Sequence, residues 1–600
     1  MTLVFDVESP AIGGRGGVVE TLDVRLIGPP RIESSTGERR ELRGQKPWAV
    51  LARVLLADRL LTRRELSAEL FPETVDPLGS LRWCLAELRR AFGVSELFSG
   101  DPIQRDLPPS ITVDLHALWD GVFDGQAVGE LLEGIDPRCG PEFSTWLLVV
   151  RQQVASRVTA LLREEIITAL SRREFDRAVR LAELHVRQSP FDEGAHVLLV
   201  KSLILHGHTE AALKHVVEVE ESFRRELGCE PSPALRSAAR AHVADPPLGV
   251  SAEAIASTLL ASGRAALAAG AADAGLDCLR RAGAQAEAAG DDGLLAQCLY
   301  ELGHGLVRSK RGFDDEAAIV LEQAAQLARS VGDVPTAVSA LRERGYADAL
   351  AGRRPEAQRH LDLAGELAGG AGGLLAGVHA IAGFNLSDWG RPSDAIARYH
   401  AAIECARGSS DRRWEAWTLA FGGWVLLGGG RVSEAVQWLT DSLTLIHDLR
   451  WVSFEPWPVA VLAEANLADD RRRAGSPSDL ERCFALSCQL EDPCWEGASG
   501  RVMALHHARR GDHERALRWI VEARTRCARK SDTWLGLLGT ILLTEAEMRA
   551  ATGDPTGADA ASRDLIGLAA RAHLDGLLPS GLAILSASPR ARHKTPHADR

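Results

Sequence analysis

Basic side chains between positions 39 and 90 are the part of this 600-residue sequence best suited to a chemical role. This stretch holds 11 Lys and Arg residues against 7 Asp and Glu residues, although the whole chain carries a formal net charge of −13. Guanidinium groups bind phosphate oxygens, and the planar fork of an arginine also fits the O6 and N7 atoms of guanine. The local reversal of charge therefore favours contact with DNA at one region of an acidic chain.

The segment 76–93 predicts the helix that would carry a base-reading side chain. Asp76 can cap its first turn, Pro77 suits the first helical position, and Gly93 ends the pattern. Apolar residues at helical spacing predict a buried stripe of Leu78, Leu81, Leu85, Leu88 and Phe92. Among the residues on the other faces, Arg82 is the best candidate for reading a guanine.

Eight further residues complete the predicted DNA-contacting set. The cations Lys46, Arg63, Arg64, Arg89 and Arg90 suit phosphates, and Ser80, Trp83 and Glu87 lie on the outer faces of the helix. Glu87 is a departure from a basic recognition helix, because a carboxylate near phosphate lowers affinity. A helix that ends in two arginines is also the ordinary pattern of a solvated face whose cations complement the helix dipole.

The elements expected to position these residues form a small mixed domain. Two strand patterns come first, at 22–26 and around Arg31. Three helical patterns follow, at 46–57, 61–71 and 76–93, and a strand pattern at 111–115 ends the domain. This order predicts a winged helix-turn-helix, whose third helix enters the major groove of DNA.

Two local signals refine that expectation. Thr62 and Glu65 have the spacing of a capping box at the start of the second helix. Residues 98–110 lack the Gly-aromatic hairpin of a usual wing, so we expect little phosphate contact from this loop.

A repeated unit of Gly, three or four polar residues, Ala and an apolar run follows in the C-terminal half. Its copies begin in steps of 40, 38, 40 and 81 residues at Gly312, Gly352, Gly390, Gly430 and Gly511. An earlier pair at Arg173 and Gly207 has the 34-residue step of tetratricopeptide repeats. Such helix pairs bury their faces only by stacking on neighbours, so the pattern predicts a superhelix.

Tryptophan is concentrated in this repeat region, where 7 of the 14 residues of the chain fall between 389 and 457. Trp414, Trp417 and Trp424 share one helical face. Core packing between stacked helices is the favoured interpretation. The alternative is an aromatic wall on the concave surface that binds a ligand or a partner protein.

Other patterns argue against catalysis and metal binding. Cys483, Cys488 and Cys494 with His506 and His507 fit no zinc spacing, so no metal site is expected. The sequence holds no G-x-x-x-x-G-K-[ST], G-x-S-x-G or H-E-x-x-H motif, and we therefore expect neither an enzyme nor a cofactor. A missing signal-peptide pattern, no long apolar run and ten scattered cysteines predict a cytoplasmic chain without a membrane partner.

The region 22–240 resembles the Streptomyces antibiotic regulatory protein (SARP) family, in which a winged helix precedes a bacterial transcriptional activator domain. The resemblance rests on four segments: SLRWCLAELRRAFG (80–93), ITVDLHAL (111–118), the hairpin 189–216, and ELGCEPSPALR (226–236). It implies promoter DNA and RNA polymerase as partners, with the winged helix binding either as two copies on direct repeats or with RNA polymerase beside it. Larger relatives often carry an ATPase after the activator domain, and its phosphate-binding motif is missing here.

These observations together predict a mainly α protein with an N-terminal winged helix-turn-helix and tetratricopeptide-like superhelical repeats. The expected order is a flexible N-terminus (1–20), a winged-helix domain (21–117), an activator domain (118–244), a linker (245–252), a repeat array (253–585) and a disordered tail (586–600).

The expected function is that of a regulator, acting as an activator, which binds double-stranded promoter DNA and contacts RNA polymerase. An unknown protein or small-molecule effector would act at the repeat array, and a homo-oligomer is compatible with the pattern. The alternative is a tetratricopeptide-type scaffold whose winged helix no longer binds DNA. Glu87, the unusual wing and the acidic net charge favour that alternative.

Overall fold

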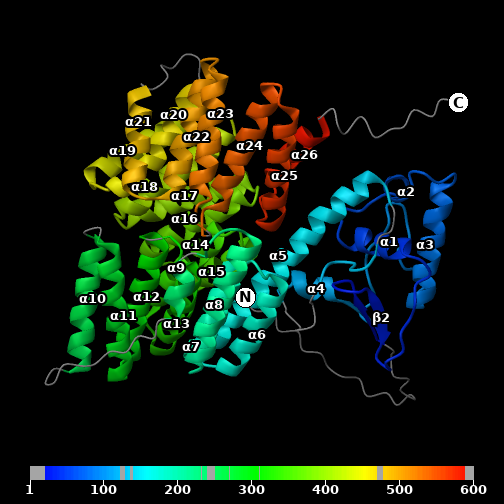
Figure 1. Ribbon diagram of the computed structural model, residues 1–600, viewed down its shortest axis with the longest axis horizontal. Helices are drawn as coiled ribbons and strands as arrows, with labels where there is room; N and C mark the ends of the chain where they lie inside the picture. Colours follow the sequence, from blue (N-terminus) through cyan, green and yellow to red (C-terminus); the bar gives the residue numbers. More distant parts are fainter. Residues whose placement is uncertain are drawn as a thin grey trace. The chain divides into compact units, whose positions relative to one another are not determined.

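The computed structural model describes residues 21–57, 59–121, 129–135, 139–231, 233–239, 251–268, 271–309, 311–468, 477–530 and 532–587 (Figure 1). The chain divides into two compact units, residues 1–158 and 159–600. Their boundary falls inside helix α5 (Pro141–Ser171), and therefore inside the expected activator domain. The predicted flexible N-terminus and most of the predicted linker and tail lie outside the described residues.

The first unit combines a three-stranded sheet with short helices. Its elements are β1 (Leu22–Arg25), β2 (Arg31–Ser34), α1 (Lys46–Leu55), α2 (Arg63–Leu70), α3 (Pro77–Phe92), β3 (Ile111–Val113) and α4 (Asp114–Trp119). Strand β1 lies in the middle of the sheet, antiparallel to β2 and parallel to β3. Val24 accordingly pairs with Ile32 on one side and with Val113 on the other.

The local signals read from the sequence are present in this unit. Thr62 and Glu65 form the predicted capping box: the Thr62 hydroxyl accepts the Glu65 amide at 3.2 Å, and the Glu65 carboxylate accepts the Thr62 amide at 2.8 Å. Helix α3 ends at Gly93, which has a φ of 70°. Residues 93–110, all of which the structure describes, form turns and contain no strand, so this loop has no wing hairpin.

The second unit consists of helices. After α5 come α6 (Phe175–Gln188), α7 (Glu193–Leu205), α8 (Thr209–Glu226) and the short α9 (Pro233–Ala238). The paired helices that follow are α10 (Ala252–Ala268) with α11 (Ala272–Ala289), α12 (Asp292–Arg308) with α13 (Asp314–Val331), α14 (Val334–Leu350) with α15 (Arg354–Ala368), α16 (Gly372–Asp388) with α17 (Pro392–Gly408), α18 (Arg412–Gly428) with α19 (Val432–Asp448), α20 (Pro456–Ala468) with α21 (Pro477–Gln489), α22 (Pro493–Arg509) with α23 (His513–Cys527), and α24 (Leu535–Ala551) with α25 (Pro555–Arg571), closed by α26 (Leu578–Ala587). The short η1 (Val452–Phe454) precedes α20.

The predicted repeats and the mainly helical fold class are confirmed. The five repeat glycines lie in the turns inside five of these helix pairs, with φ between 74° and 102°, a region that side chains other than glycine rarely adopt. Most helices of the array are 17 residues long. Two such helices and two short turns account for a period near 40, which is longer than the tetratricopeptide period of about 34.

Helix α14 lies at the centre of the array. Helices α12, α14, α16 and α18 pack on one another as well as on their own partners, so they form an inner layer of the superhelix. Nearly all side chains of α14 from Thr336 to Leu350 are buried, including Arg342, Glu343, Arg344 and Asp348. Charged residues on this helix must therefore find their partners inside the protein.

The C-terminal repeats fold back onto earlier turns of the array. The Asp532 carboxylate accepts the backbone amides of Gly312 and Phe313, at the turn that begins α13. The Trp534 indole donates to Asp388 at 2.7 Å, and Arg354 binds the same carboxylate at 3.1 Å. These bonds close the array on itself.

Close helix crossings in the array depend on glycine, and one position tests this. A Cβ on Gly345 of α14 would lie 2.8 Å from Leu361 and 3.2 Å from the carbonyl oxygen of Ala357. We expect Gly345→Ala to lower the free energy of unfolding by about 1–3 kcal/mol through overpacking.

The matched control is Gly283→Ala in α11, where the added Cβ would meet only Leu299 at 3.8 Å. This variant is expected to gain up to about 1 kcal/mol, because alanine favours helix. Urea unfolding of the two full-length variants measures the difference. Equal stabilisation of both would contradict the role assigned to Gly345.

Candidate nucleic-acid interface and repeat-array core

Helix α3 presents one exposed stripe made of predicted DNA-contacting residues. The side chains of Arg82 and Arg90 are 70% and 50% exposed, and Trp83 is 52% exposed. Ala86 lies between them on the same face and is also exposed. Arg82 makes a 3.5 Å ion pair with the exposed Asp76, an interaction weak enough to be replaced by a ligand. Small, aromatic and cationic groups at this spacing match what a base edge and its flanking phosphates can bind.

The other predicted cations divide into two groups. Arg64 on α2 is exposed to solvent. Lys46, Arg63 and Arg89 are partly buried, and each donates to backbone carbonyls: Lys46 to Leu70 at 3.3 Å, Arg63 to Gly100 at 2.9 Å, and Arg89 to Leu97 at 2.9 Å. These three side chains therefore hold the loops around α3. The Ser80 hydroxyl likewise donates to the carbonyl of Asp76 at 3.1 Å.

Glu87 does not project outward as the sequence suggested. Its side chain is 6% exposed, accepts the backbone amide of Arg43 at 2.8 Å and pairs with Arg90 at 2.7 Å. The Arg90 guanidinium, through its hydrogen bonds, lowers the pKa of Glu87 to about 2. Glu87 thus ties α3 to the loop before α1, and its negative charge is already neutralised by Arg90.

The predicted apolar stripe of α3 is correct except at its first member. Leu81, Leu85, Leu88 and Phe92 are at most 3% exposed, whereas Leu78 is 47% exposed. Leu78 occupies the first turn of α3, where the helix extends past its neighbours. It adds an apolar group to the exposed face, which the sequence pattern had assigned to the core.

The three tryptophans proposed for a groove lie in a large aromatic cluster of the inner layer. Trp417 is 2% exposed and is therefore a core residue, in agreement with the favoured interpretation and against the alternative of a groove wall. Trp414 and Trp424 are half-buried. Arg342 lies 5.0 Å from the ring of Trp414, and Trp424 stacks on Trp457 with 4.4 Å between ring centres.

A shallow depression beside Trp424 on the inner face of the later repeats has no room for a water molecule. Its walls are mainly apolar, and its polar edge is the ion pair of Glu464 and Arg501, at 2.7 Å, with the Thr544 hydroxyl 2.8 Å from the same arginine. Its remaining lining residues are Trp457, Ala460, Val461, Ala498, Val502 and Leu537.

The cysteines and histidines considered for metal binding do not converge. Cys483 donates to the carbonyl of Pro456, whereas Cys494 lies near Thr533. Across the described residues no three His, Cys, Asp or Glu side chains gather as metal ligands. None of the described helices has the length and apolarity needed to cross a membrane.

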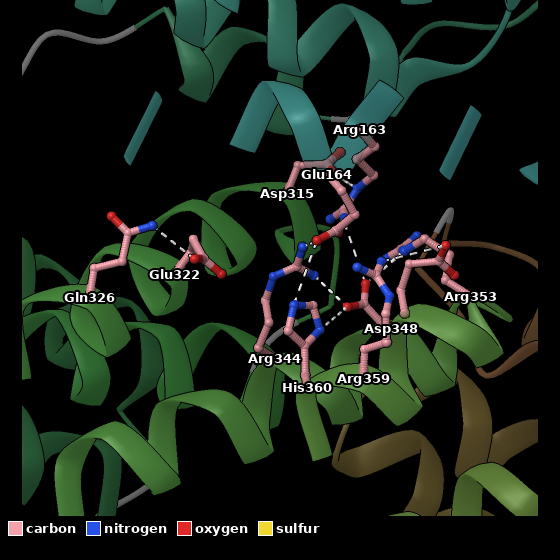
Figure 2. Close-up of polar contacts among 11 residues, drawn as sticks. Arg163, Glu164, Asp315, Glu322, Gln326, Arg344, Asp348, Arg353, Arg359 and His360 are labelled. Carbon is pink, nitrogen blue, oxygen red and sulfur yellow. Dashed lines mark hydrogen bonds and ion pairs between the residues drawn. The ribbon is translucent and has the colours of Figure 1, made fainter. Parts of the chain in front are cut away.

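A buried network of charges joins α5 to α13, α14 and α15 (Figure 2). Asp348 is fully buried and accepts Arg344 at 2.6 Å and Arg353 at 2.7 Å. From α5, Arg163 bonds to Asp315 at 2.8 Å and lies 3.4 Å from Asp348. Burial alone would raise the pKa of Asp348, but Arg344 and Arg353 outweigh it and hold that pKa well below its ordinary value.

Apolar contacts reinforce the same junction. Ala318 and Ile319 of α13 belong to one buried cluster with Ile166 and Leu170 of α5 and Leu198 of α7. Helix α5 is therefore fixed to the array by an ionic and an apolar interface at once.

The sequence of residues 117–241 matches the protein family described as Bacterial transcriptional activator domain. The chain carries a bacterial transcriptional activator domain. This match spans α5 to α9 and the motif at 226–236, and it confirms the predicted resemblance to the SARP family. Residues 117–241 thus resemble the activator domain of SARP-type transcriptional regulators, and tetratricopeptide-like repeats follow them in the chain. A comparison with curated proteins gives no match.

Several solved structures are similar to parts of the chain. EmbR of Mycobacterium tuberculosis, in complex with a low-affinity phosphopeptide, is 20% identical, with a TM-score of 0.27; the similarity covers 37% of this chain and 64% of the EmbR chain. A Rap protein complexed with competence and sporulation factor is 13% identical over 71% of this chain and 99% of its own, with a TM-score of 0.32. Aspartyl phosphate phosphatase F from Bacillus subtilis is 11% identical over 68% and 93%, with a TM-score of 0.36.

The role of Glu87 leads to a prediction about pH. Its folded-state pKa near 2 lies below the ordinary 4.5, so the ionised carboxylate stabilises the N-terminal unit above pH 4.5. This contribution is lost as the pH falls from 4.5 toward 2. We expect Glu87→Gln to cost about 1–3 kcal/mol at pH 7, and the difference from the native chain to shrink over that window.

Urea unfolding of the full chain at several pH values measures the effect. Glu96→Gln is the control, because Glu96 is exposed in the loop after α3. A cost for Glu87→Gln that stays constant down to pH 2 would show that the carboxylate is not held by Arg90 and Arg43.

Proposed function

We propose that this chain is a transcriptional activator that binds double-stranded promoter DNA through α3. The observation that carries the proposal is the exposed stripe of Arg82, Trp83, Ala86 and Arg90 on a capped helix. In the sequence this helix precedes the activator domain. In this arrangement α3 lies in the major groove, Arg82 reads a guanine, and Arg64 and Arg90 contact phosphates. Trp83 and Leu78 offer apolar contact to a thymine methyl group.

Helix α3 is held in place for this role by side chains that bond to the neighbouring backbone. Lys46, Arg63 and Arg89 fix the neighbouring loops through carbonyl bonds. Glu87 orients the Arg90 guanidinium at 2.7 Å while half of the Arg90 side chain stays exposed. With no wing hairpin after α3, the phosphate contacts come from α2 and α3 alone, and we expect modest affinity for random DNA.

The activator domain would contact RNA polymerase, and the array would receive a protein or small-molecule effector. The half-buried Trp414 and Trp424 support an effector surface on the inner face. The route from this surface to the activator domain is the charge network between α14 and α5, because a change in the inner layer displaces the partners of Arg163.

The DNA-binding proposal predicts a selective loss in one variant. Arg82→Ala is expected to weaken binding at the preferred promoter site by about 1–3 kcal/mol and to change binding to random DNA little. Gel shifts of the full chain with its own upstream region, at two salt concentrations, measure this effect and the loss of affinity with salt.

Arg329→Ala is the matched control, since Arg329 is an exposed arginine on α13 of the array. An equal loss on both DNAs would make Arg82 a phosphate contact. If the full chain retards no DNA at either salt concentration, the scaffold interpretation replaces the regulator.

The coupling route predicts a second effect, at the junction of α5 and the array. Arg163→Met removes the charge that pairs with Asp315 and Asp348, and a broken buried ion network costs about 3–5 kcal/mol. We expect amide hydrogen exchange to rise in α5, α7 and α13 while α22 to α25 keep their protection.

Arg177→Met is the control, because Arg177 makes only exposed ion pairs with Glu165 and Glu174. If α5 keeps its native protection in Arg163→Met, the network does not hold the activator domain to the array.

A further inference from the structure

Two buried thiols lie where α22, α23 and the segment before α24 meet. Cys494 is the second residue of α22 and Cys527 is the last residue of α23. Their side chains are 1% and 0% exposed. Neither residue is part of the DNA-facing stripe, the ion network or the aromatic cluster described above.

Glycine brings these two helices close enough for the thiols to interact. A Cβ on Gly497, one turn after Cys494, would lie 2.7 Å from the Cβ of Cys527 and 3.2 Å from its sulfur. A Cβ on Gly500, the next residue along the same face, would lie 3.1 Å from the Cβ of Ala523. The crossing of α22 and α23 thus places Cys527 directly against the first turn of α22.

The two sulfurs share one set of polar contacts. The Thr533 hydroxyl lies 3.6 Å from the Cys494 sulfur and 3.5 Å from the Cys527 sulfur, and the backbone amide of Trp534 donates to Cys494 at 3.5 Å. The Thr533 hydroxyl therefore lies within hydrogen-bond distance of both sulfurs, and Cys494 in addition accepts the Trp534 amide.

Cys494 differs from the other buried cysteines in the direction of its pKa shift. The neighbouring Cys527, together with the nearby Arg311 cation, lowers the pKa of Cys494, whereas Cys494 and burial raise the pKa of Cys527. Burial raises the pKa of Cys483 to about 12 and that of Cys298 to about 11. Since the thiolate is the reactive form, Cys494 is the nucleophile of the pair and Cys527 the second thiol.

We propose that Cys494 and Cys527 form a redox site, which peroxides oxidise to an intrachain disulfide. The Cys494 thiolate attacks one peroxide oxygen, the O–O bond breaks, and the other oxygen leaves as water after taking a proton, giving a sulfenic acid at Cys494. The Cys527 sulfur then attacks the Cys494 sulfur, an S–S bond forms, and the sulfenic oxygen leaves as a second water. Two thiols are oxidised and one hydrogen peroxide is reduced to two waters.

The two cysteines lie beside the segment 532–534, whose contacts join the C-terminal repeats to earlier turns of the array. Oxidation of the cysteines therefore acts on these contacts. Thr533, which touches both sulfurs, is flanked by Asp532, which binds the turn that begins α13, and by Trp534, which binds Asp388. Closing an S–S bond changes the partners of Thr533 and shifts this segment. The Trp534 ring lies 5.1 Å from the rings of Phe384 and Trp457, and its fluorescence reports the shift.

Burial of the thiols sets the expected rate. With both sulfurs almost fully buried, peroxide reaches them only when the segment around Thr533 opens. Oxidation is therefore slower than at the exposed Cys229, which serves as an internal reference in the same chain.

The experiment treats the full-length reduced chain with hydrogen peroxide, blocks free thiols with N-ethylmaleimide and maps the peptides by mass spectrometry. We expect a Cys494–Cys527 link that forms after Cys229 is oxidised, changes tryptophan fluorescence and is reversed by dithiothreitol. In Cys527→Ser, dimedone should trap a sulfenic acid at Cys494. In Cys494→Ser, Cys527 should stay reduced. Cys298→Ser is the matched control and should form the link as the native chain does.

Peptide mapping of the native chain tests for the Cys494–Cys527 disulfide even where a serine variant fails to fold. Both thiols remaining free after complete oxidation of Cys229 would overturn the proposal. So would a link from either residue to a different cysteine, or oxidation of Cys494 to a sulfinic acid without any link to Cys527.

Discussion

The carboxylate of Asp348 is buried at the point where four helices meet, and much of the second unit depends on its neutralisation. An unpaired charge in a protein interior costs several kcal/mol, so Arg344, Arg353 and Arg163 must all stay within reach of it. These arginines come from α14, the turn before α15, and α5. Helix α5 therefore cannot separate from the array without leaving buried charges unpaired. This constraint makes the activator domain and the repeats one folded body from Thr159 onward.

The turn before α13 also receives contacts from the C-terminal repeats. Asp532 binds the amides at Gly312 and Phe313, and two residues later Asp315 binds Arg163 of α5. A short chain of polar contacts thus connects the segment beside the two thiols with the activator domain. Under the proposed function, this connection would carry a signal from the late repeats to a domain hundreds of residues earlier in the sequence. It also explains why charged residues are tolerated so deep inside a helical superhelix.

In the N-terminal unit, residue spacing predicted part of the exposed face of α3 correctly and part of it wrongly. Residue types and spacing were enough to place Arg82, Trp83 and Arg90 on the outside of a capped helix, because helical periodicity alone sets which residues share a face. Periodicity could not assign Leu78 or Glu87 correctly. Leu78 is exposed because the first turn of α3 has no neighbour to cover it, and Glu87 is buried because a loop 44 residues earlier supplies the amide of Arg43.

The sequence by itself determined the helical and strand segments, the capping box at Thr62, the turn glycines of the repeats and the activator domain motif, because each depends on residues close together in the chain. The tertiary structure alone decided which partners meet across long separations: Arg163 with Asp348, Trp534 with Asp388, and Cys494 with Cys527. The sequence places Trp417 on the same face as two half-buried tryptophans, yet packing of the inner layer made it a core residue. Local propensity and periodicity act over one or two helical turns, whereas burial and charge pairing are set only when distant segments pack together.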